Sequence, residues 1–404
     1  MLNMTYEYKL EPTLSQAQAF DHWLEVCCKV WNYALRERKD WYNSRSCAIN
    51  ACSMKAEYII PADAPRPNFA VQCKSLTTAR QGNSELKTVH SQVLQQVLKQ
   101  LEKAFTSMWE SGFGFPRFKK KGRMRSFLFP TPNKTVVVGN KINLPSIGLV
   151  KFRDSRPIPD GFAVKQIRIV KRASGYFAML ALSLDVFIPS AMPHGHALGI
   201  DLGLEKFLAT SDNELVARPK FFLDAQRKLK SLQKVVSRKR IGSKNWQKAQ
   251  KKVARYHQHI SDSRKDFHFK TAHHLCNQAG MIFAEDLNVK AMSRGMLCKH
   301  TLDAGFGQFL SILEYMCFKE DIFFLKVDKN GTSQTCPQCQ THTGKKPLSL
   351  RIHQCPECGY EVDRDVAAAQ VVVQRGLAAV GHTVKMLSEG KATRLPVMKE
   401  SHAL

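Results

Sequence analysis

The sequence predicts a multidomain α+β protein, in which a small β-barrel with a helical insertion precedes an α/β domain that carries a four-cysteine module. Two observations predict the first part: residues from about 134 to 188 alternate with a period of two, and two amphipathic helical stripes lie between residues 13 and 112. Two CxxC pairs identify the module in the second part. A length of 404 residues is also too great for one ordinary core and suggests two or three domains.

The chain begins with a predicted strand and helix. Residues Thr5 to Leu10 alternate as a strand does, and Thr13-Leu14-Ser15-Gln16 has the pattern of a helix capping box. Residues 43 to 86 lack clear periodicity and predict loop and short helix. Apolar residues at three- and four-residue steps predict two helices, which we interpret as core; they are Phe20, Leu24, Cys27, Trp31 and Leu35, then Leu94, Leu98, Leu101, Phe105 and Trp109.

Short alternating segments follow, separated by Gly and Pro, and several such strands are typical of a small barrel. The N-terminal strand can join them, which makes the helices an insertion. We therefore expect a barrel from residues 1–12 and 113–190 and a helical insertion at 13–112. The predicted strands are Thr135 to Val138, Lys141 to Leu144, Leu149 to Phe152, Val164 to Lys171 and Tyr176 to Leu184.

The second part, residues 191–331, reads as an α/β domain after a linker that starts at Pro189. Residues Ala197 to Thr210 predict a strand pair, and Met281 to Ala284 predict a short buried strand. A helical block, residues 218–276, lies between them as an insertion. The cysteine module occupies residues 332–362, a last helix residues 363–376, and a tail expected to be disordered residues 377–404.

The charge balance is strongly basic: 61 Lys and Arg against 34 Asp and Glu give a formal charge of +27. Such an excess is usually neutralised by a polyanion, most often nucleic acid, although a membrane surface has the same effect. The sequence shows no apolar run of about 18 residues and no N-terminal signal, so we expect a soluble, intracellular protein that needs no membrane.

The basic residues are concentrated in the helical block, where residues 218–270 hold 17 Lys and Arg and 3 Asp. A solvated helix face is the ordinary interpretation of a charge run. The bias in sign favours instead a surface that follows phosphate groups. The candidate contacts are Lys248, Lys251, Lys252 and Arg255.

Four of the twelve cysteines form two CxxC pairs separated by 15 residues: Cys336, Cys339, Cys355 and Cys358. Four thiolates at this spacing can close a tetrahedral site around one zinc ion, and no coordination position then stays open for catalysis. A redox-active CxxC pair is the weaker alternative. We interpret the other eight cysteines as core or incidental thiols.

Acidic residues define a second candidate site. Asp201 lies in an apolar strand and is followed by Leu202 and Gly203, Glu285 ends the buried strand, and Asp365 opens the last helix. Each acid alone has an ordinary explanation as turn former, surface residue or helix cap. Several buried carboxylates together need cations, and Mg²⁺ is the usual partner of oxygen-only clusters. Two Mg²⁺ ions held by three carboxylates can support hydrolysis of a phosphodiester.

Six segments, in order along most of the chain, make the sequence recognisable: 114–121 (GFPRFKKK), 199–204 (GIDLGL), 285–287 (EDL), 303–307 (DAGFG), 332–336 (TSQTC) and 363–365 (DRD). In these segments the chain resembles the TnpB family of transposon-encoded RNA-guided nucleases, relatives of the miniature type V CRISPR effectors. The resemblance implies a wedge barrel with an inserted helical recognition lobe, then an RNase H-like (RuvC) nuclease domain interrupted by a zinc ribbon.

The resemblance also implies site residues and partners. It makes Asp201, Glu285 and Asp365 the catalytic metal-binding acids and Arg351 a basic residue near them. The basic residues of segment 114–121 become candidate nucleic-acid contacts: Arg117, Lys119, Lys120 and Lys121. The partners it implies are a guide RNA and a matching double-stranded DNA with a short adjacent motif, and base pairing would supply most of the specificity. It predicts no oligomeric state.

The chain departs from the family pattern at three positions. Ala367 stands where Asn is usual, Gln340 where Gly is usual, and Phe306 where Trp is common. Three other functions stay open: a nuclease-inactive RNA-guided repressor, a strand-transferring transposase on the same fold, and a miniature CRISPR effector. The three intact acids argue against the repressor.

Overall fold

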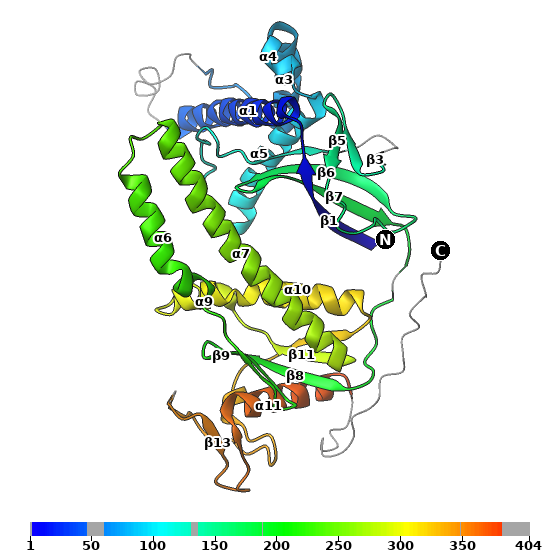
Figure 1. Cartoon of the computed structure of the whole chain (residues 1–404), viewed down its shortest axis with the longest axis vertical. Helices are drawn as coiled ribbons and strands as arrows, with labels where there is room; N and C mark the ends of the chain where they lie inside the picture. The colour runs from blue at the N-terminus through cyan, green and yellow to red at the C-terminus, as the bar shows by residue number, and fades with distance from the viewer. Residues whose placement is uncertain (1, 47–59, 131–135, 188, 348, 382–404) are drawn as a thin grey trace. The chain divides into compact units, whose positions relative to one another are not determined.

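The computed structural model describes residues 2–46, 60–130, 136–187, 189–347 and 349–381 (Figure 1). The chain divides into two compact units, Met1–Ile188 and Pro189–Leu404. The predicted C-terminal tail lies almost entirely outside the described residues. Within the described ranges, no helix combines the length and the apolar character needed to cross a membrane.

The first unit contains a seven-stranded antiparallel sheet with the order β2-β6-β7-β1-β5-β4-β3. Strand β1 pairs with β7 along Leu2 to Lys9 and with β5 at Leu10 and Glu11, so the N-terminal strand joins the sheet as expected. No pairing among the described strands connects β2 to β3, so closure of the barrel stays a prediction. The strands are β1 (Leu2–Glu11), β2 (Ser126–Phe129), β3 (Val137–Val138), β4 (Lys141–Leu144), β5 (Gly148–Phe152), β6 (Ala163–Arg172) and β7 (Gly175–Leu184).

Helices α1 (Leu14–Ser46) and α5 (Ser91–Ser111) pack against each other beside this sheet. The capping box is confirmed: the Thr13 N–H donates to Gln16 Oε1 at 3.1 Å, and the Gln16 N–H donates to Thr13 Oγ1 at 3.3 Å. Both apolar stripes are buried except at Trp109, which is 44% exposed. The helical core prediction is therefore correct for nine of the ten stripe residues.

Two further helices, α3 (Phe69–Gly82) and α4 (Ser84–Lys87), lie in the stretch predicted as loop and short helix. Helix α3 is capped by Asn68, whose side chain accepts a hydrogen bond from the Val71 N–H at 3.0 Å. Of its residues only Gln72 is fully buried, while Phe69, Cys73 and Leu76 are partly buried against the core, a stripe too short to distinguish this helix from loop by periodicity. Residues 47–59 of the same stretch lie outside the described residues.

The second unit contains a five-stranded sheet in the order β10-β9-β8-β11-β12. Strands β8 (Ala197–Leu202), β11 (Met281–Glu285) and β12 (Phe323–Val327) are parallel, while β9 (Lys206–Thr210) and β10 (Leu215–Ala217) are antiparallel additions. The buried strand predicted at Met281 and the strand pair predicted from Ala197 are both present.

Helices cover both faces of this sheet and form three layers. On one face Ile200 and Ile282 join a core with α7 (Lys244–Gln278) and α10 (Phe306–Lys319). On the other, Phe283 packs with residues of α11 (Arg364–Ala379). A Cβ on Gly199 would lie 2.1 Å from the Ala369 carbonyl oxygen, so the glycine lets α11 approach β8 closely.

The helical insertion is a hairpin of α6 (Phe221–Ser237) and α7, which pack along each other (Figure 1). Short helices α8 (Val289–Met292) and α9 (Cys298–Ala304) follow β11. Between β12 and α11 lies the cysteine module, with a 3-10 turn η1 (Thr332–Gln334) and a small antiparallel ribbon of β13 (Ile352–Gln354) and β14 (Glu361–Asp363).

Candidate catalytic and metal-binding sites

The three predicted acids meet at one edge of the second unit's sheet. Strands β8 and β11 run parallel with Ile200 beside Ala284, so the next residues, Asp201 and Glu285, lie side by side at the ends of these two strands. Asp365 lies in the first turn of α11, and its Oδ2 lies 4.0 Å from the position of a Cβ on Gly203. The parallel register and the start of one helix thus bring together residues 164 positions apart in the chain.

The negative charges of these three carboxylates repel one another. Burial, followed by the nearby charges of Glu285 and Asp365, raises the pKa of Asp201 well above its usual range. Burial also raises the pKa of Glu285, a shift that the hydrogen bond from Thr332 opposes. The pKa of Asp365 is raised by burial and by Asp363, and Arg351 and Arg364 oppose that shift. Crowded carboxylates of this kind gain stability from a bound cation.

The structure does not support a helix cap at Asp365 or a surface role for Glu285, which are the ordinary explanations of these two acids. Asp363, rather than Asp365, caps α11: its Oδ1 accepts the Asp365 N–H at 2.9 Å. Glu285 is 9% exposed, which excludes a surface role. Ala367, the departure from the family pattern, is buried at 1% exposure in α11, so it contributes packing rather than a polar group.

Arg351 lies near Asp365 and forms an ion pair with Glu205. Glu205 follows Asp201 in the turn between β8 and β9 and raises the pKa of Asp365. Sequence reasoning did not single out Glu205, because one acid in a turn carries no spacing signal. Its position four residues after Asp201, in the turn that follows β8, is the only hint that the sequence holds.

The four cysteines of the two CxxC pairs converge in the second unit. Their sulfur atoms all lie within 4.8 Å of one another, with Cys336 and Cys358 3.7 Å apart and Cys339 and Cys355 3.5 Å apart. Hydrogen bonds from Thr341 lower the pKa of Cys339 to about 6, which favours the thiolate that a metal needs, whereas burial raises the pKa of Cys336. Four thiolates with these separations suit one tetrahedral zinc ion. Among the described residues, no other group of three or more His, Cys, Asp or Glu is as tightly clustered.

Gln340, which replaces the usual Gly after the first pair, has a backbone φ of 63°. This left-handed conformation normally favours Gly. The Gln340 side chain offsets the strain with two hydrogen bonds, to Gln374 Oε1 on α11 at 2.6 Å and to the Pro337 carbonyl at 3.2 Å. The departure therefore ties the cysteine module to α11.

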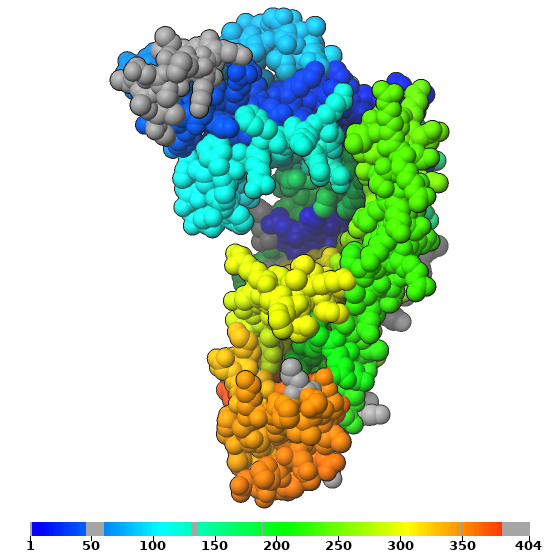
Figure 2. Space-filling view, turned by 90° about the vertical axis from the view of Figure 1, so that its left-hand side faces the viewer, coloured from blue at the N-terminus to red at the C-terminus, as the bar shows by residue number. Residues whose placement is uncertain are grey.

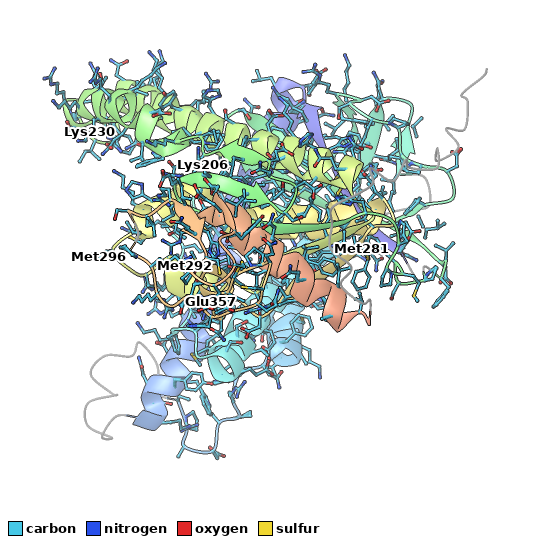
Figure 3. All side chains as sticks on the ribbon, turned by 90° about the horizontal axis from the view of Figure 1, so that it is seen from below. Lys206, Lys230, Met281, Met292, Met296 and Glu357 are labelled. Carbon is cyan, nitrogen blue, oxygen red and sulfur yellow. The ribbon has the colours of Figure 1, made fainter. Side chains whose placement is uncertain are left out.

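The predicted basic residues of the hairpin all reach solvent. Lys248, Lys251, Lys252 and Arg255 are exposed on α7. Figure 2 shows α6 and α7, in green, as an elongated ridge of the second unit. Side chains project outward along both helices in Figure 3, in which Lys230 marks α6. This surface is accessible to a long polyanion.

The basic segment 114–121 lies against α1, and its members differ. Arg117, Lys120 and Lys121 are exposed, and Lys121 also pairs with Glu25 at 3.0 Å. Lys119 is half-buried with its ammonium 3.7 Å from the centre of the Trp31 ring, and burial lowers its pKa. Lys119 therefore has a packing role that its place in a basic run does not indicate.

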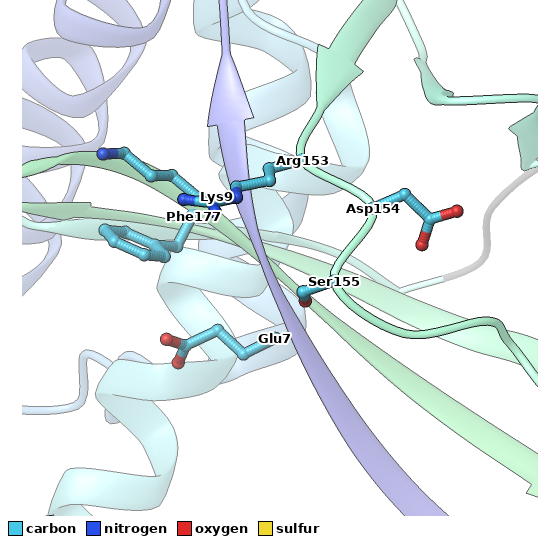
Figure 4. Close-up of a pocket in the computed structure, with 6 residues that line it drawn as sticks. All are labelled: Glu7, Lys9, Arg153, Asp154, Ser155 and Phe177. Atoms are coloured by element: carbon cyan, nitrogen blue, oxygen red, sulfur yellow. The ribbon is translucent and has the colours of Figure 1, made fainter.

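A hollow of about 440 Å³ lies on the sheet of the first unit (Figure 4). It contains two acids and two bases and none of the predicted site residues. The mixed charge favours neither a polyanion nor a metal. Its lining residues are Glu7, Lys9, Arg153, Asp154, Ser155 and Phe177.

Three family models match the chain: a "Probable transposase" over residues 184–296, a "Cas12f1-like, TNB domain" over 306–372 and a "Helix-turn-helix domain" over 1–47. A relative from Escherichia coli K12, "Putative RNA-guided DNA endonuclease InsQ", is 31% identical over 98% of this chain and 96% of its own length. This chain belongs to the TnpB family. Residues 2–46 of this TnpB protein form one strand and one long helix, so the third description does not fit its structure.

Other relatives agree with this assignment. A "Putative RNA-guided DNA endonuclease" of Streptomyces pristinaespiralis is 29% identical over 93% of this chain and 89% of its own length. A solved structure titled "Cryo-EM structure of the Cas12f1-sgRNA-target DNA complex" aligns with a TM-score of 0.52 at 13% identity, covering 89% of this chain and 83% of that one. The last comparison shows a shared multidomain α/β fold.

Proposed function

We propose that this TnpB protein is an RNA-guided DNA endonuclease that hydrolyses phosphodiester bonds with two Mg²⁺ ions. The observation that carries the proposal is the convergence of Asp201, Glu285 and Asp365 at the end of two parallel strands and the start of a helix. The full-length relatives named as RNA-guided DNA endonucleases support the guided reaction.

The residues present fit a magnesium site. The cluster offers carboxylate oxygens, which Mg²⁺ prefers, and their mutual repulsion favours a cation. The three acids are less tightly grouped than the four sulfurs, which is compatible with more than one ion. When bound, the ions supply an activated water and charge stabilisation for the leaving oxygen.

The chain's own residues then have separate roles. Asp201, Glu285 and Asp365 hold the ions, and the Arg351 guanidinium is available for a phosphate if the phosphate replaces Glu205 as its partner. The exposed bases of α7 hold nucleic-acid backbone without reading sequence. Pairing between the guide RNA and one DNA strand selects the target beside a short adjacent motif.

The proposed domains follow the functional parts. A wedge barrel of residues 1–12 and 113–190 and a recognition lobe of residues 13–112 bind the guide and target. A RuvC-type nuclease domain, residues 191–331 and 363–376, carries the acids. A zinc ribbon, residues 332–362, holds one structural zinc ion through its four cysteines.

The test is a cleavage assay with the purified full chain, its copurified RNA and DNA matched to that RNA. We expect cleavage that requires Mg²⁺ and disappears after RNase treatment. Strand joining without RNA would favour a strand-transferring transposase instead. The matching family model carries the description "Probable transposase". Guided binding without cleavage under any divalent metal would favour the repressor. A repeat array beside the gene would identify a CRISPR effector instead of a transposon nuclease.

A further inference from the structure

The segment 332–336 (TSQTC) belongs to the family pattern, and the proposed function gives it no role beyond Cys336. Its first residue, Thr332, is 4% exposed and directs its hydroxyl toward the acidic cluster. Thr332 Oγ1 donates a hydrogen bond to Glu285 Oε1 at 2.5 Å. The Lys329 carbonyl lies farther from the same hydroxyl, at 3.2 Å, and a hydroxyl has only one proton to donate. The short contact to a carboxylate is the stronger of the two.

We propose that Thr332 is a positioning residue, which fixes the Glu285 carboxylate so that its second oxygen, Oε2, faces the metal site. A glutamate side chain has three rotatable bonds, so a metal-binding carboxylate needs a second partner to hold it in one orientation. This inference rests on the proposed function, because it assumes that Glu285 binds a metal.

The turn that contains Thr332 is itself rigidly held. Gly331 adopts a left-handed φ of 72°, and its carbonyl accepts hydrogen bonds from the Gln334 N–H at 3.0 Å and from Thr335 Oγ1 at 2.9 Å. One residue later, the Cys336 N–H donates to the Thr341 carbonyl at 2.9 Å. Thr332 is therefore fixed by the same short segment that leads into the first cysteine pair.

The cysteine module is also attached to α11, which carries Asp365. Gln374 Nε2 of α11 donates to the Pro337 carbonyl between the first two cysteines at 2.6 Å, and η1 packs on α11. Folding of the module around zinc thus sets the position of Thr332 relative to both Glu285 and Asp365. The zinc ribbon acquires a role in orienting the catalytic acids without touching the substrate.

The test measures metal binding directly, on the full chain, with Mn²⁺ as the probe and electron paramagnetic resonance as the readout. Thr332→Val keeps the shape of the side chain and removes the hydroxyl. It should raise the Kd for Mn²⁺ by about tenfold, as loss of a partner that orients a metal ligand usually does. Thr332→Ser retains the hydroxyl and should stay within about twofold of the unmodified chain.

Ser333→Ala is the matched control. Ser333 lies in the same turn, and its hydroxyl makes no hydrogen bond to Glu285 within the described structure. This variant should bind Mn²⁺ unchanged. All variants should hold one zinc ion and bind guided DNA as the unmodified chain does, and Thr332→Ala replaces the valine variant if that one folds poorly. In cleavage, Thr332→Val should need about tenfold more Mg²⁺ for half-maximal rate and recover at high Mg²⁺.

Glu285→Gln, measured in parallel, tests the proposed metal site separately from the positioning role of Thr332. Unchanged Mn²⁺ binding by Glu285→Gln would mean that the proposed metal site is wrong. Weakened binding by Glu285→Gln together with unchanged binding by Thr332→Val and Thr332→Ala would overturn only the positioning role of Thr332.

Discussion

Asp303 Oδ1 accepts a hydrogen bond from the backbone N–H of Phe222 at 2.8 Å, although the two residues are 81 positions apart. The same oxygen pairs with Arg264 Nη2 at 3.2 Å. Phe222 lies in the first turn of α6, Arg264 in α7, and Asp303 in α9, which leads to α10. The buried Asp303 carboxylate therefore connects the α6–α7 hairpin to α9, next to the five-stranded sheet that carries Asp201 and Glu285.

Asp303→Ala should destabilise this junction by about 3 kcal/mol, because it leaves the Arg264 charge and the Phe222 N–H without their partner in a buried place. Asp303→Asn keeps an acceptor for Phe222 and should be milder. Chemical denaturation of the full chain, with hydrogen exchange of the peptide that contains Phe222, measures both effects.

Asp266→Ala is the control for this prediction. It removes an exposed aspartate that pairs with Lys270 at 2.8 Å on the same hairpin, so it should change stability by less than about 1 kcal/mol. Equal effects of Asp303→Ala and Asp266→Ala would show that the buried carboxylate has no special role.

Local patterns predicted part of the helices and strands and the candidate ligands, because each of these depends on neighbours in sequence; strand β12 and helix α10 were not predicted. The capping box at Thr13 and the strand that ends at Glu285 are examples, and both are present. The contacts of Asp303, Thr332 and Glu205 depend on pairings across 81, 47 and 146 positions, for which one sequence holds no spacing rule. The positions of Asp201, Glu285 and Asp365 at strand and helix ends made them a candidate site, but each was weak evidence alone, and the resemblance to a family gave them their catalytic role.

The basic residues also show what sequence alone does not predict. Lys119 and Lys120 are adjacent and chemically identical, yet one packs on Trp31 and the other is exposed. Composition predicts that a run of bases attracts phosphate, and only the fold shows which members are accessible.

Zinc removal should unfold the cysteine module. We expect about one zinc ion per chain by elemental analysis, as a single four-thiolate site requires. Cys355→Ser should lower both zinc content and folded yield, whereas Cys298→Ser, at a cysteine without metal-ligand spacing, should change neither. A disulfide between Cys336 and Cys339 with no zinc bound would contradict the assignment.

Neutralising the α7 ridge should weaken nucleic-acid binding in a salt-dependent way. Replacing Lys248, Lys251, Lys252 and Arg255 by Gln removes four exposed charges. The slope of log K against log salt should become about 3 units shallower if all four contact phosphates, since each contact contributes about 0.7 to 0.9. Exchanging Lys for Arg and Arg for Lys at these positions keeps the charge and should keep the slope. An unchanged slope in the Gln variant would mean a merely solvated face.

Acid should destabilise the second unit through His268. This side chain is fully buried, stacks on Phe207 with centroids 5.5 Å apart, and hydrogen-bonds the Ala304 carbonyl through Nε2 at 2.9 Å. Burial, with a smaller effect of Arg264, lowers its pKa to about 4. Protonation therefore favours the unfolded chain, whose histidine has a pKa of about 6.5.

The contribution of His268 to the free energy of unfolding should fall as pH decreases from about 6.5 to about 4, by up to about 3 kcal/mol at about 1.4 kcal/mol for each pKa unit. His268→Gln should flatten the pH dependence of unfolding between pH 6.5 and 5.5. His257→Gln, at an exposed histidine, should leave that dependence as it is.

Asp201→Asn should separate stability from catalysis. The substitution preserves shape but removes one of three crowded negative charges, whose repulsion and burial raise the pKa of Asp201. Without divalent metal, in EDTA at neutral pH, the variant should therefore be more stable than the unmodified chain by on the order of 1 kcal/mol. Cleavage of guide-matched DNA should be lost, because an amide cannot supply the charge that holds the ions, while guided binding should survive on the bases elsewhere. Calorimetry in EDTA, a cleavage assay with Mg²⁺ and a gel shift on the same DNA measure the three effects.

Asp160→Asn, at an exposed carboxylate of the first unit, should change none of them. Full cleavage by the Asp201→Asn protein would remove Asp201 from the active site, and a loss of stability in EDTA would show that its charge is already compensated by the protein.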